Sequence, residues 1–241
     1  MATRNRALSH AAELLVEQRS HVLIVLSNSQ AGSDPEFRNW YLGAYQRTVL
    51  KLEGVLGGRQ YEAHEVDVSG GKYPGLPYQY FGVYDVCVDG AVNAGGILDY
   101  IRDLHRREPV AQAPATWLYY PVSERVGGRP AAQPSLLTVA FANAVPGQDE
   151  EFREWYATRH IRHALQIPAL VSGQCFARTQ FQRAGALDAA FSMIALYEQE
   201  GSPEEMRRSF ATIPAGTLDF PAMDLTRFAE WVYKPCEPAA T

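Results

Sequence analysis

The chain has 241 residues, a length that fits one large domain or two compact domains of about 110 residues each. Its 22 Lys and Arg residues against 27 Asp and Glu residues give a net charge of −5, which argues against a nucleic-acid-binding protein because such proteins need basic patches to neutralise phosphates. Hydrophobic residues make up 46% of the chain and charged residues 20%, which excludes global disorder because a core can be buried.

Other broad classes of protein are excluded by local composition. No apolar run approaches the roughly 18 residues of a membrane helix, so no membrane partner is expected. The three cysteines contain no CxxC pair, which argues against a disulfide framework and a cysteine zinc site. Residues 1–20 are predicted to form a helical extension, and Glu13 and Glu17 interrupt what would be the apolar stretch of a signal peptide. These features predict a cytoplasmic protein.

The chain repeats itself at a spacing of about 115 residues. Residues 36–41 read Glu-Phe-Arg-Asn-Trp-Tyr, and residues 151–156 read Glu-Phe-Arg-Glu-Trp-Tyr. Three further pairs of segments match in the same order: 21–28 with 135–143, 83–85 with 196–198, and 115–121 with 229–235. We therefore predict a first repeat over residues 21–122, a Gly- and Pro-rich linker over 123–134, and a second repeat over 135–241.

Each repeat contains six predicted elements. In chain order the first repeat has a strand at 22–26, a helix at 34–52, strands at 57–66 and 79–88, a helix at 91–107 and a closing strand at 115–121. The second repeat has a strand at 136–141, a helix from 149 to 167, strands at 172–181 and 191–198, a helix at 203–213 and a closing strand at 229–235. Asp34-Pro35-Glu36 opens the first of these helices, and Pro168 ends its counterpart.

The order β-α-β-β-α-β, twice over, predicts an α+β fold of two ferredoxin-like repeats. Helices cover one face of such a sheet, so the two uncovered faces are expected to pack together as an intrachain α+β barrel that encloses a cavity. Loops 69–78 and 214–224 contain Gly and Pro, and each could be a lid or an ordinary surface turn.

A longer motif in the second repeat resembles a known family. It runs Phe152-x-x-Trp155-Tyr156-x-x-x-His160-x-x-x-x-Leu165-x-Ile167-Pro168, followed by Gly173 and Phe176. This pattern is similar to the EthD-like family of the dimeric α+β barrel superfamily. The first repeat keeps part of the pattern but has Tyr45 where the family has His. The resemblance implies a tandem fusion of two units that relatives supply as separate chains, with any single reacting site beside His160.

Three residues are candidates for chemistry. His160 could act as a general acid or base, or could be a structural residue at the corner between helix and strand. His64 and Arg178 lie in predicted strands, where they would supply a base and a cation for a developing oxyanion if they point inward, or would be ordinary exposed residues if they point outward.

Several aromatic residues and one further histidine are candidate contacts to a small apolar or aromatic substrate. For each the alternative is core packing. These candidates are Tyr45, Trp155, Tyr156, His163, Tyr119 and Tyr233. Trp117 with Tyr119 and Trp231 with Tyr233 alternate along strands, so each pair must point to one face of its sheet, either to the helices or to the cavity.

The leading functional prediction is a cofactor-independent enzyme that transfers protons on an aromatic or polyketide-like compound, as an isomerase, cyclase, C–C lyase or decarboxylase. The first alternative is a haem-binding protein similar to the chlorite-dismutase-like members, with His160 or His163 as the iron ligand. The second is a non-catalytic protein that binds a small molecule. No metal site is predicted, because His160-x-x-His163 alone is a weak pattern. A homodimer is expected, since a sheet edge would be exposed.

Overall fold

The computed structural model describes residues 19–73, 75, 77–128, 136–183, 191–214 and 216–236. In the first repeat, β1 (His21–Ser27) is followed by a long helix in three parts, α2 (Asp34–Trp40), the π-helical turn η1 (Tyr41–Tyr45) and α3 (Gln46–Val49). Then come β2 (Val55–Ala63), β3 (Tyr80–Val86), α4 (Ala91–Arg107) and β4 (Ala115–Pro121). The short strand β5 (Val126–Gly127) lies in the predicted linker.

The second repeat has the same order of elements. It begins with β6 (Leu136–Ala142), and its long helix again has three parts, α5 (Asp149–Trp155), the π-helical turn η2 (Tyr156–His160) and α6 (Ile161–Ala164). They are followed by β7 (Leu170–Arg178), β8 (Met193–Gln199), α7 (Pro203–Ala211), the 3₁₀ turn η3 (Leu225–Arg227) and β9 (Ala229–Pro235). The predicted α+β fold of two ferredoxin-like repeats is therefore confirmed.

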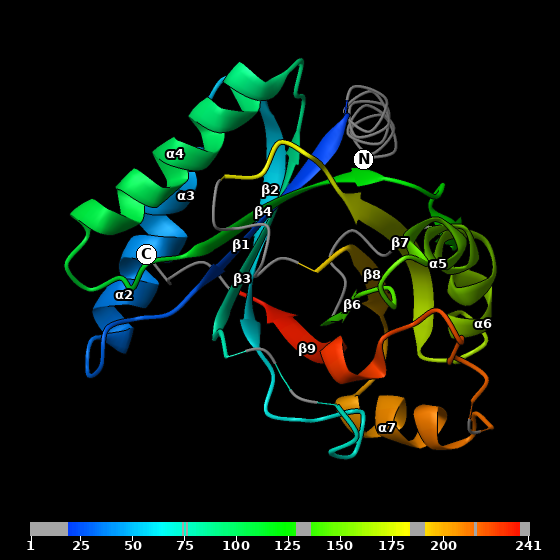
Figure 1. Cartoon of the computed structure of the whole chain (residues 1–241). Coiled ribbons are helices and arrows are strands. Elements are labelled where there is room, and N and C mark those ends of the chain that lie inside the picture. Colours follow the sequence, from blue (N-terminus) through cyan, green and yellow to red (C-terminus); the bar gives the residue numbers. More distant parts are fainter. Residues whose placement is uncertain are drawn as a thin grey trace, which may run out of the picture.

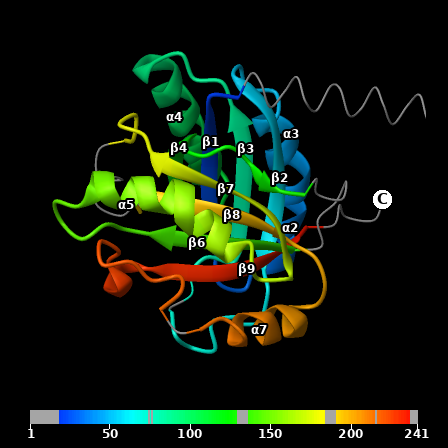
Figure 2. The ribbon, with the colours of Figure 1, turned by 90° about the vertical axis from the view of Figure 1, so that its right-hand side faces the viewer.

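The strands form a closed antiparallel barrel. Their order is β4-β1-β3-β2-β9-β6-β8-β7, and β4 also pairs with β7, so the ring closes on itself. Two pairings join the repeats, β2 with β9 (Tyr61 opposite Pro235) and β4 with β7 (Tyr119 opposite Arg178). The helices of the first repeat and those of the second lie on opposite sides of the barrel (Figures 1 and 2).

Successive side chains along each strand point to opposite faces of the sheet, and this divides the core into three layers. Inside the barrel, inward-facing residues of both repeats pack together, and Phe81 of β3 stacks on Tyr233 of β9 with ring centroids 4.8 Å apart. Two other apolar layers lie between the outer faces of the sheet and the helices of each repeat. Burying one such aromatic side chain contributes about 1.5–3 kcal/mol, so the shared inner layer binds the repeats firmly together.

That packed inner layer corrects one expectation. The two sheet faces do meet, but side chains such as Phe141 and Trp117 fill the space between them, where an enclosed cavity was predicted. Large aromatic residues of both repeats therefore pack against one another inside the barrel.

The boundaries of several elements also differ from the predicted ones. The strand expected at 57–66 ends at Ala63, because the backbone N–H of Val66 donates to Nδ1 of His64 (3.1 Å) and turns the chain. The predicted linker 123–134 is partly ordered, since β5 pairs with β7. Most of the predicted N-terminal extension, residues 1–18, and linker residues 129–134 lie outside the described residues. No helix in the described part of the chain is long and apolar enough to cross a membrane.

Candidate active site

A cavity of about 340 Å³ lies between the outer face of the second repeat's sheet and its covering segments. Its floor is formed by strands β6, β8 and β9, and its walls by α6, α7 and the segment 213–219. The loop 68–73 of the first repeat also lines it, and α7 lies beside this loop in both views of the ribbon (Figures 1 and 2). The loop is fastened at Asp67, whose carbonyl oxygen accepts a hydrogen bond from Nε of Arg207 (3.3 Å).

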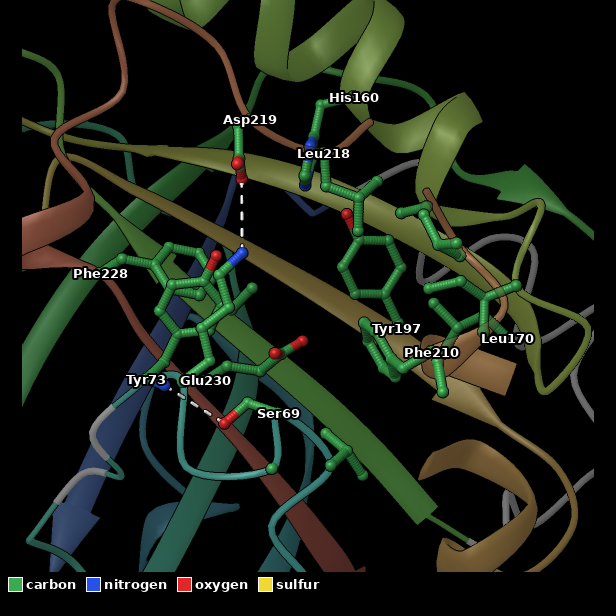
Figure 3. A pocket seen from close by; sticks show the side chains of 18 of the residues that line it. Ser69, Tyr73, His160, Leu170, Tyr197, Phe210, Leu218, Asp219, Phe228 and Glu230 are labelled. Carbon is green, nitrogen blue, oxygen red and sulfur yellow. Dashed lines mark hydrogen bonds and ion pairs between the residues drawn. The ribbon is translucent and has the colours of Figure 1, made fainter. Parts of the chain in front are cut away.

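Glu230 is the most unusual residue of the cavity. It lies on β9 between two residues that face the barrel interior, Ala229 and Trp231, so its own side chain points to the helix side and into the cavity (Figure 3). Burial raises the pKa of Glu230 to about 7, Asp67 adds to the rise, and Lys72 acts against it. A carboxyl group with this pKa can both take up and release a proton at neutral pH.

His160 lies on the opposite wall, at the end of the π-helical turn η2. Its ring stacks on Tyr156, with centroids 4.5 Å apart and planes 9° apart, and Trp155 packs at 4.9 Å. Burial, with His163 nearby, lowers the pKa of His160 to about 3, while a hydrogen bond to the Leu218 backbone acts in the other direction. His160 is therefore neutral at pH 7.

Tyr197 of β8 stands between these two residues, with its hydroxyl directed toward the end of the cavity where His160 lies (Figure 3). Burial raises the pKa of Tyr197 well above its ordinary value, so the hydroxyl keeps its proton. Among the described residues, Oη of Tyr197 and Nδ1 of His160 are buried and have no hydrogen-bond partner. An unpaired buried polar atom is costly, so a ligand that pairs with the hydroxyl would be stabilised there.

The cavity entrance carries charge and aromatic rings. Nζ of Lys72 lies 3.8 Å from Oδ1 of Asp219, and it also lies over the ring of Tyr73 at 4.8 Å. Tyr73 packs edge-on against Phe228 at 4.4 Å. The cavity thus has a charged mouth and, around Leu170 and Phe210, an apolar end (Figure 3).

Of the other predicted site residues, three lie directly around His160. Trp155 and Tyr156 contact its ring from the core side, and Trp155 stacks on Phe220 at 4.6 Å. His163 is half-buried, and it is close enough to His160 to lower the pKa of that residue. None of these three lines the cavity, so they support His160 and do not form the wall.

The remaining predicted site residues lie elsewhere in the fold. His64 follows β2 and accepts the Val66 N–H, and Arg178 ends β7 opposite Tyr119. Tyr119 and Tyr233 belong to the barrel interior, where Oη of Tyr119 donates to the carbonyl of Phe191 (3.0 Å). Tyr45, the counterpart of His160, is buried in the first repeat against His105. The structure does not bring these residues to the cavity.

Sequence reasoning missed Glu230 and Tyr197. The signal for Glu230 was present, because an acidic residue that alternates with Trp231 and Tyr233 must face the other side of its strand. The first repeat has Thr116 at the matching position, so the two repeats also differ in this acidic residue. Tyr197 matches Tyr84, and nothing in the sequence distinguishes the two.

The described residues contain no group of three or more His, Cys, Asp or Glu side chains that could hold a metal ion. The polar side chains that line the cavity include the carboxyl of Glu230 with its raised pKa, the neutral imidazole of His160 and the phenol of Tyr197. The others are Ser69, Lys72, Tyr73, Arg207 and Asp219. This set can move a proton and can stabilise a developing negative charge on oxygen.

Comparison with known proteins identifies the fold. No protein-family model and no curated protein matches the chain. A chlorite dismutase variant from Candidatus Nitrospira defluvii in complex with cyanide has a TM-score of 0.56 at 11% identity, covering 93% of this chain and 94% of its own. An anthrone oxidase-like protein has a TM-score of 0.54 at 10% identity, covering 91% and 92%. A candidate monooxygenase from Fusobacterium nucleatum has a TM-score of 0.54 at 7% identity, and the match covers 91% of this chain and 94% of its own.

At these identities the similarity shows the fold alone. The chain is similar over most of its length to these solved chains, which agrees with the α+β fold of two ferredoxin-like repeats. The resemblance to EthD-like proteins, expected from the helix motif of the second repeat, stays a prediction.

Proposed function

We propose that the chain is a cofactor-independent enzyme that moves a proton on a small aromatic or polyketide-like ketone, and that it is a divergent relative of EthD-like proteins. One observation carries the proposal: Glu230, with a pKa of about 7, lies in the same largely apolar cavity as Tyr197, a phenol without a partner among the described residues. A carboxylate of this pKa matches the working pH of a general base.

The proposed reaction begins when the carboxylate of Glu230 removes a proton from a carbon conjugated with the substrate carbonyl, either beside it or, as in anthrone, across a ring from it. The electron pair of the C–H bond moves into the ring system, and the carbonyl oxygen becomes an enolate oxygen. The hydroxyl of Tyr197 donates a hydrogen bond to this oxygen. Protonated Glu230 then returns the proton to another atom, which gives an isomer, or the enolate reacts further by cyclisation or bond cleavage. Neutral His160 shapes the wall beside Tyr197.

Anthrone is a suitable probe because it is an aromatic ketone with an acidic methylene group, and one structural neighbour is anthrone oxidase-like. The experiment follows loss of the methylene proton signal by NMR in deuterated buffer without oxygen. We expect exchange above the buffer rate for the wild type, and a loss of at least about 100-fold in Glu230→Gln, the lower end of what general-base catalysis contributes.

Glu53→Gln is the matched control, because Glu53 is an exposed acid of the first repeat and should leave the exchange rate unchanged. Tyr197→Phe should slow exchange without changing the pH at which Glu230 titrates. Exchange at the wild-type rate in Glu230→Gln would refute the proposal. Tight binding of anthrone without exchange would support the non-catalytic binding protein instead.

Haem is the other candidate that the fold superfamily implies. The cavity offers one histidine and the cations Lys72 and Arg207, which are suitable group types for iron and propionates. However, Nδ1 of His160 is buried by the protein, and the other ring nitrogen is hydrogen-bonded to the backbone of Leu218. Iron could bond to His160 only if the segment 213–219 moved, so the residues in this arrangement do not fit haem.

Haemin titration followed by absorption tests this conclusion. We expect no Soret band that saturates at one haem per chain. A stoichiometric band that disappears in His160→Ala, while the variant stays folded by circular dichroism, would make haem the better candidate.

A further inference from the structure

A second cluster of polar residues lies on the other face of the sheet from the cavity, at one end of the barrel interior. It contains three arginines, Arg19 before β1, Arg59 on β2 and Arg125 before β5, and two acids, Asp85 on β3 and Glu198 on β8. Arg59, Asp85 and Glu198 alternate with residues that face the helices, so they belong to the inner face of the barrel. The cluster caps the apolar interior, since the guanidinium of Arg19 lies over the Phe176 ring at 5.4 Å.

The charges in this cluster do not balance. Arg19 pairs with Asp85 (2.8 Å) and with the amide oxygen of Gln174 (2.6 Å). Arg125 pairs with Glu198 and donates to Ser172 (2.9 Å), while Arg59 reaches the same Glu198 only at 4.0 Å. Counted over the described residues, three cations thus face two carboxylates, which leaves one positive charge in excess.

The three guanidinium groups lie close enough to affect one another. Burial lowers the pKa of Arg125, and the nearby cations Arg19 and Arg59 lower it further, so the guanidinium groups repel one another. Within the described residues, Nε of Arg19 is buried and has no acceptor. Each guanidinium carries five N–H donors, which is more than these few acceptors can pair with.

We propose that this end of the barrel binds a small multivalent oxyanion, a phosphate or a compact polycarboxylate, between Arg59 and Arg125. Both of these side chains are about half-exposed, so an anion can reach them from solvent, while Arg19 contributes charge from the buried side. Guanidinium groups bind phosphate and carboxylate oxygens in pairs, which suits two arginines that now share one carboxylate. The site is separate from the cavity and does not depend on the proposed activity.

Isothermal titration of the full chain with pyrophosphate, in about 150 mM chloride so that weak surface attraction is screened, tests the proposal. We expect one site with a Kd below about 1 mM. Citrate titrated in the same way distinguishes a polycarboxylate ligand from a phosphate ligand. Arg59→Gln should weaken binding about tenfold or more, because it removes a charge-assisted contact. The fold should survive, since Arg59 is half-exposed and its contacts are the long one to Glu198 and one to the hydroxyl of Tyr61.

Arg102→Gln is the matched control, because it removes one positive charge from an exposed position on α4 and should leave the Kd unchanged. Arg125→Gln gives an independent second test. Two results would overturn the proposal: no saturable binding of either anion at about 10 mM, well above the expected Kd, or equal affinity in wild type and Arg59→Gln. Equal weakening in Arg59→Gln and Arg102→Gln would also overturn it, because binding would then reflect net charge alone.

Discussion

Glu230 and His160 line one cavity, and burial disfavours the charged form of each. The pKa of Glu230 rises to about 7, and the pKa of His160 falls to about 3. The two residues therefore make stability depend on pH in opposite directions, and their contributions can be measured separately.

For Glu230, the folded state holds a proton that the unfolded chain releases above its ordinary pKa of 4.5. Stability contributed by the neutral carboxyl is therefore present at low pH and is lost as the pH rises through 7. Between pH 4 and pH 8 we expect Glu230→Gln to gain about 3 kcal/mol in unfolding free energy relative to wild type, at 1.36 kcal/mol per pKa unit. Urea unfolding of both proteins at the two pH values measures this, and parallel pH profiles would contradict it.

For His160 the dependence of stability on pH has the opposite direction. The unfolded chain takes up a proton below pH 6.5, whereas the folded protein resists protonation down to about pH 3. Stability is therefore lost as the pH falls below 6.5. From pH 7 to pH 4.5 we expect wild type to lose about 3 kcal/mol more than His160→Gln, from the same conversion. The measurement is urea unfolding at both pH values, and His64→Gln, which alters a histidine outside the cavity, is the control.

At the scale of elements, each repeat packs a tyrosine ring against a glycine of the neighbouring strand. Gly173 on β7 lets the ring of Tyr197 pack against the backbone, since a Cβ there would lie 2.5 Å from its Cδ1 atom. Gly58 on β2 does the same for Tyr84, at 2.1 Å. Only the first of these tyrosines lines the cavity.

We expect Gly173→Ala and Gly58→Ala each to cost about 1–3 kcal/mol of stability, because both overpack a buried ring. Only Gly173→Ala should also slow anthrone exchange, since it displaces the Tyr197 hydroxyl. Thermal unfolding and the exchange assay on the same samples compare the two variants. Equal exchange rates in Gly173→Ala and Gly58→Ala would mean that Tyr197 takes no part in the proposed reaction.

Element order was predictable from the sequence, whereas the site was predictable only in part. The repeat of Glu-Phe-Arg-x-Trp-Tyr and the alternation in the closing strands indicated both βαββαβ units, and the candidate residue His160 lines the cavity. The cavity's position was not predictable, because it depends on which sheet face the aromatic residues fill. Tyr119 and Tyr233 fill the inner face, so the space that remains lies under the helices. The contribution of loop 68–73 from the other repeat depends on tertiary contacts that no local pattern encodes.

At the scale of the whole molecule, one inner core is shared by both repeats. Phe81 of the first repeat stacks on Tyr233 of the second and lies near Phe141. We expect Phe81→Ala to cost about 3–5 kcal/mol and to lower the melting temperature of the molecule as a unit. Calorimetry should show one transition before and after the change. Two separated transitions would mean that the repeats unfold independently.

The homodimer expected from sequence stays a prediction, but its stated reason does not hold for this barrel. Every strand of the described ring is paired on both sides, and only β5 lies outside it. A dimer would therefore have to form through side-chain surfaces instead of through a strand edge. Light scattering measures whether the mass in solution is that of one chain or two.

Closure of the ring also bears on the order in which the protein can assemble. β2 pairs with β9 through residues 61–63 and 233–235, more than half the chain apart, and the other junction joins residues 119–121 to 176–178. Pairings between such distant segments slow folding, because the intervening chain loses entropy before the contacts form. During synthesis the first repeat can form its own sheet early, yet its inner aromatic face stays uncovered until β9 has been made. That interval, when Phe81 and Trp117 lack their partners, is when the chain is most exposed to aggregation.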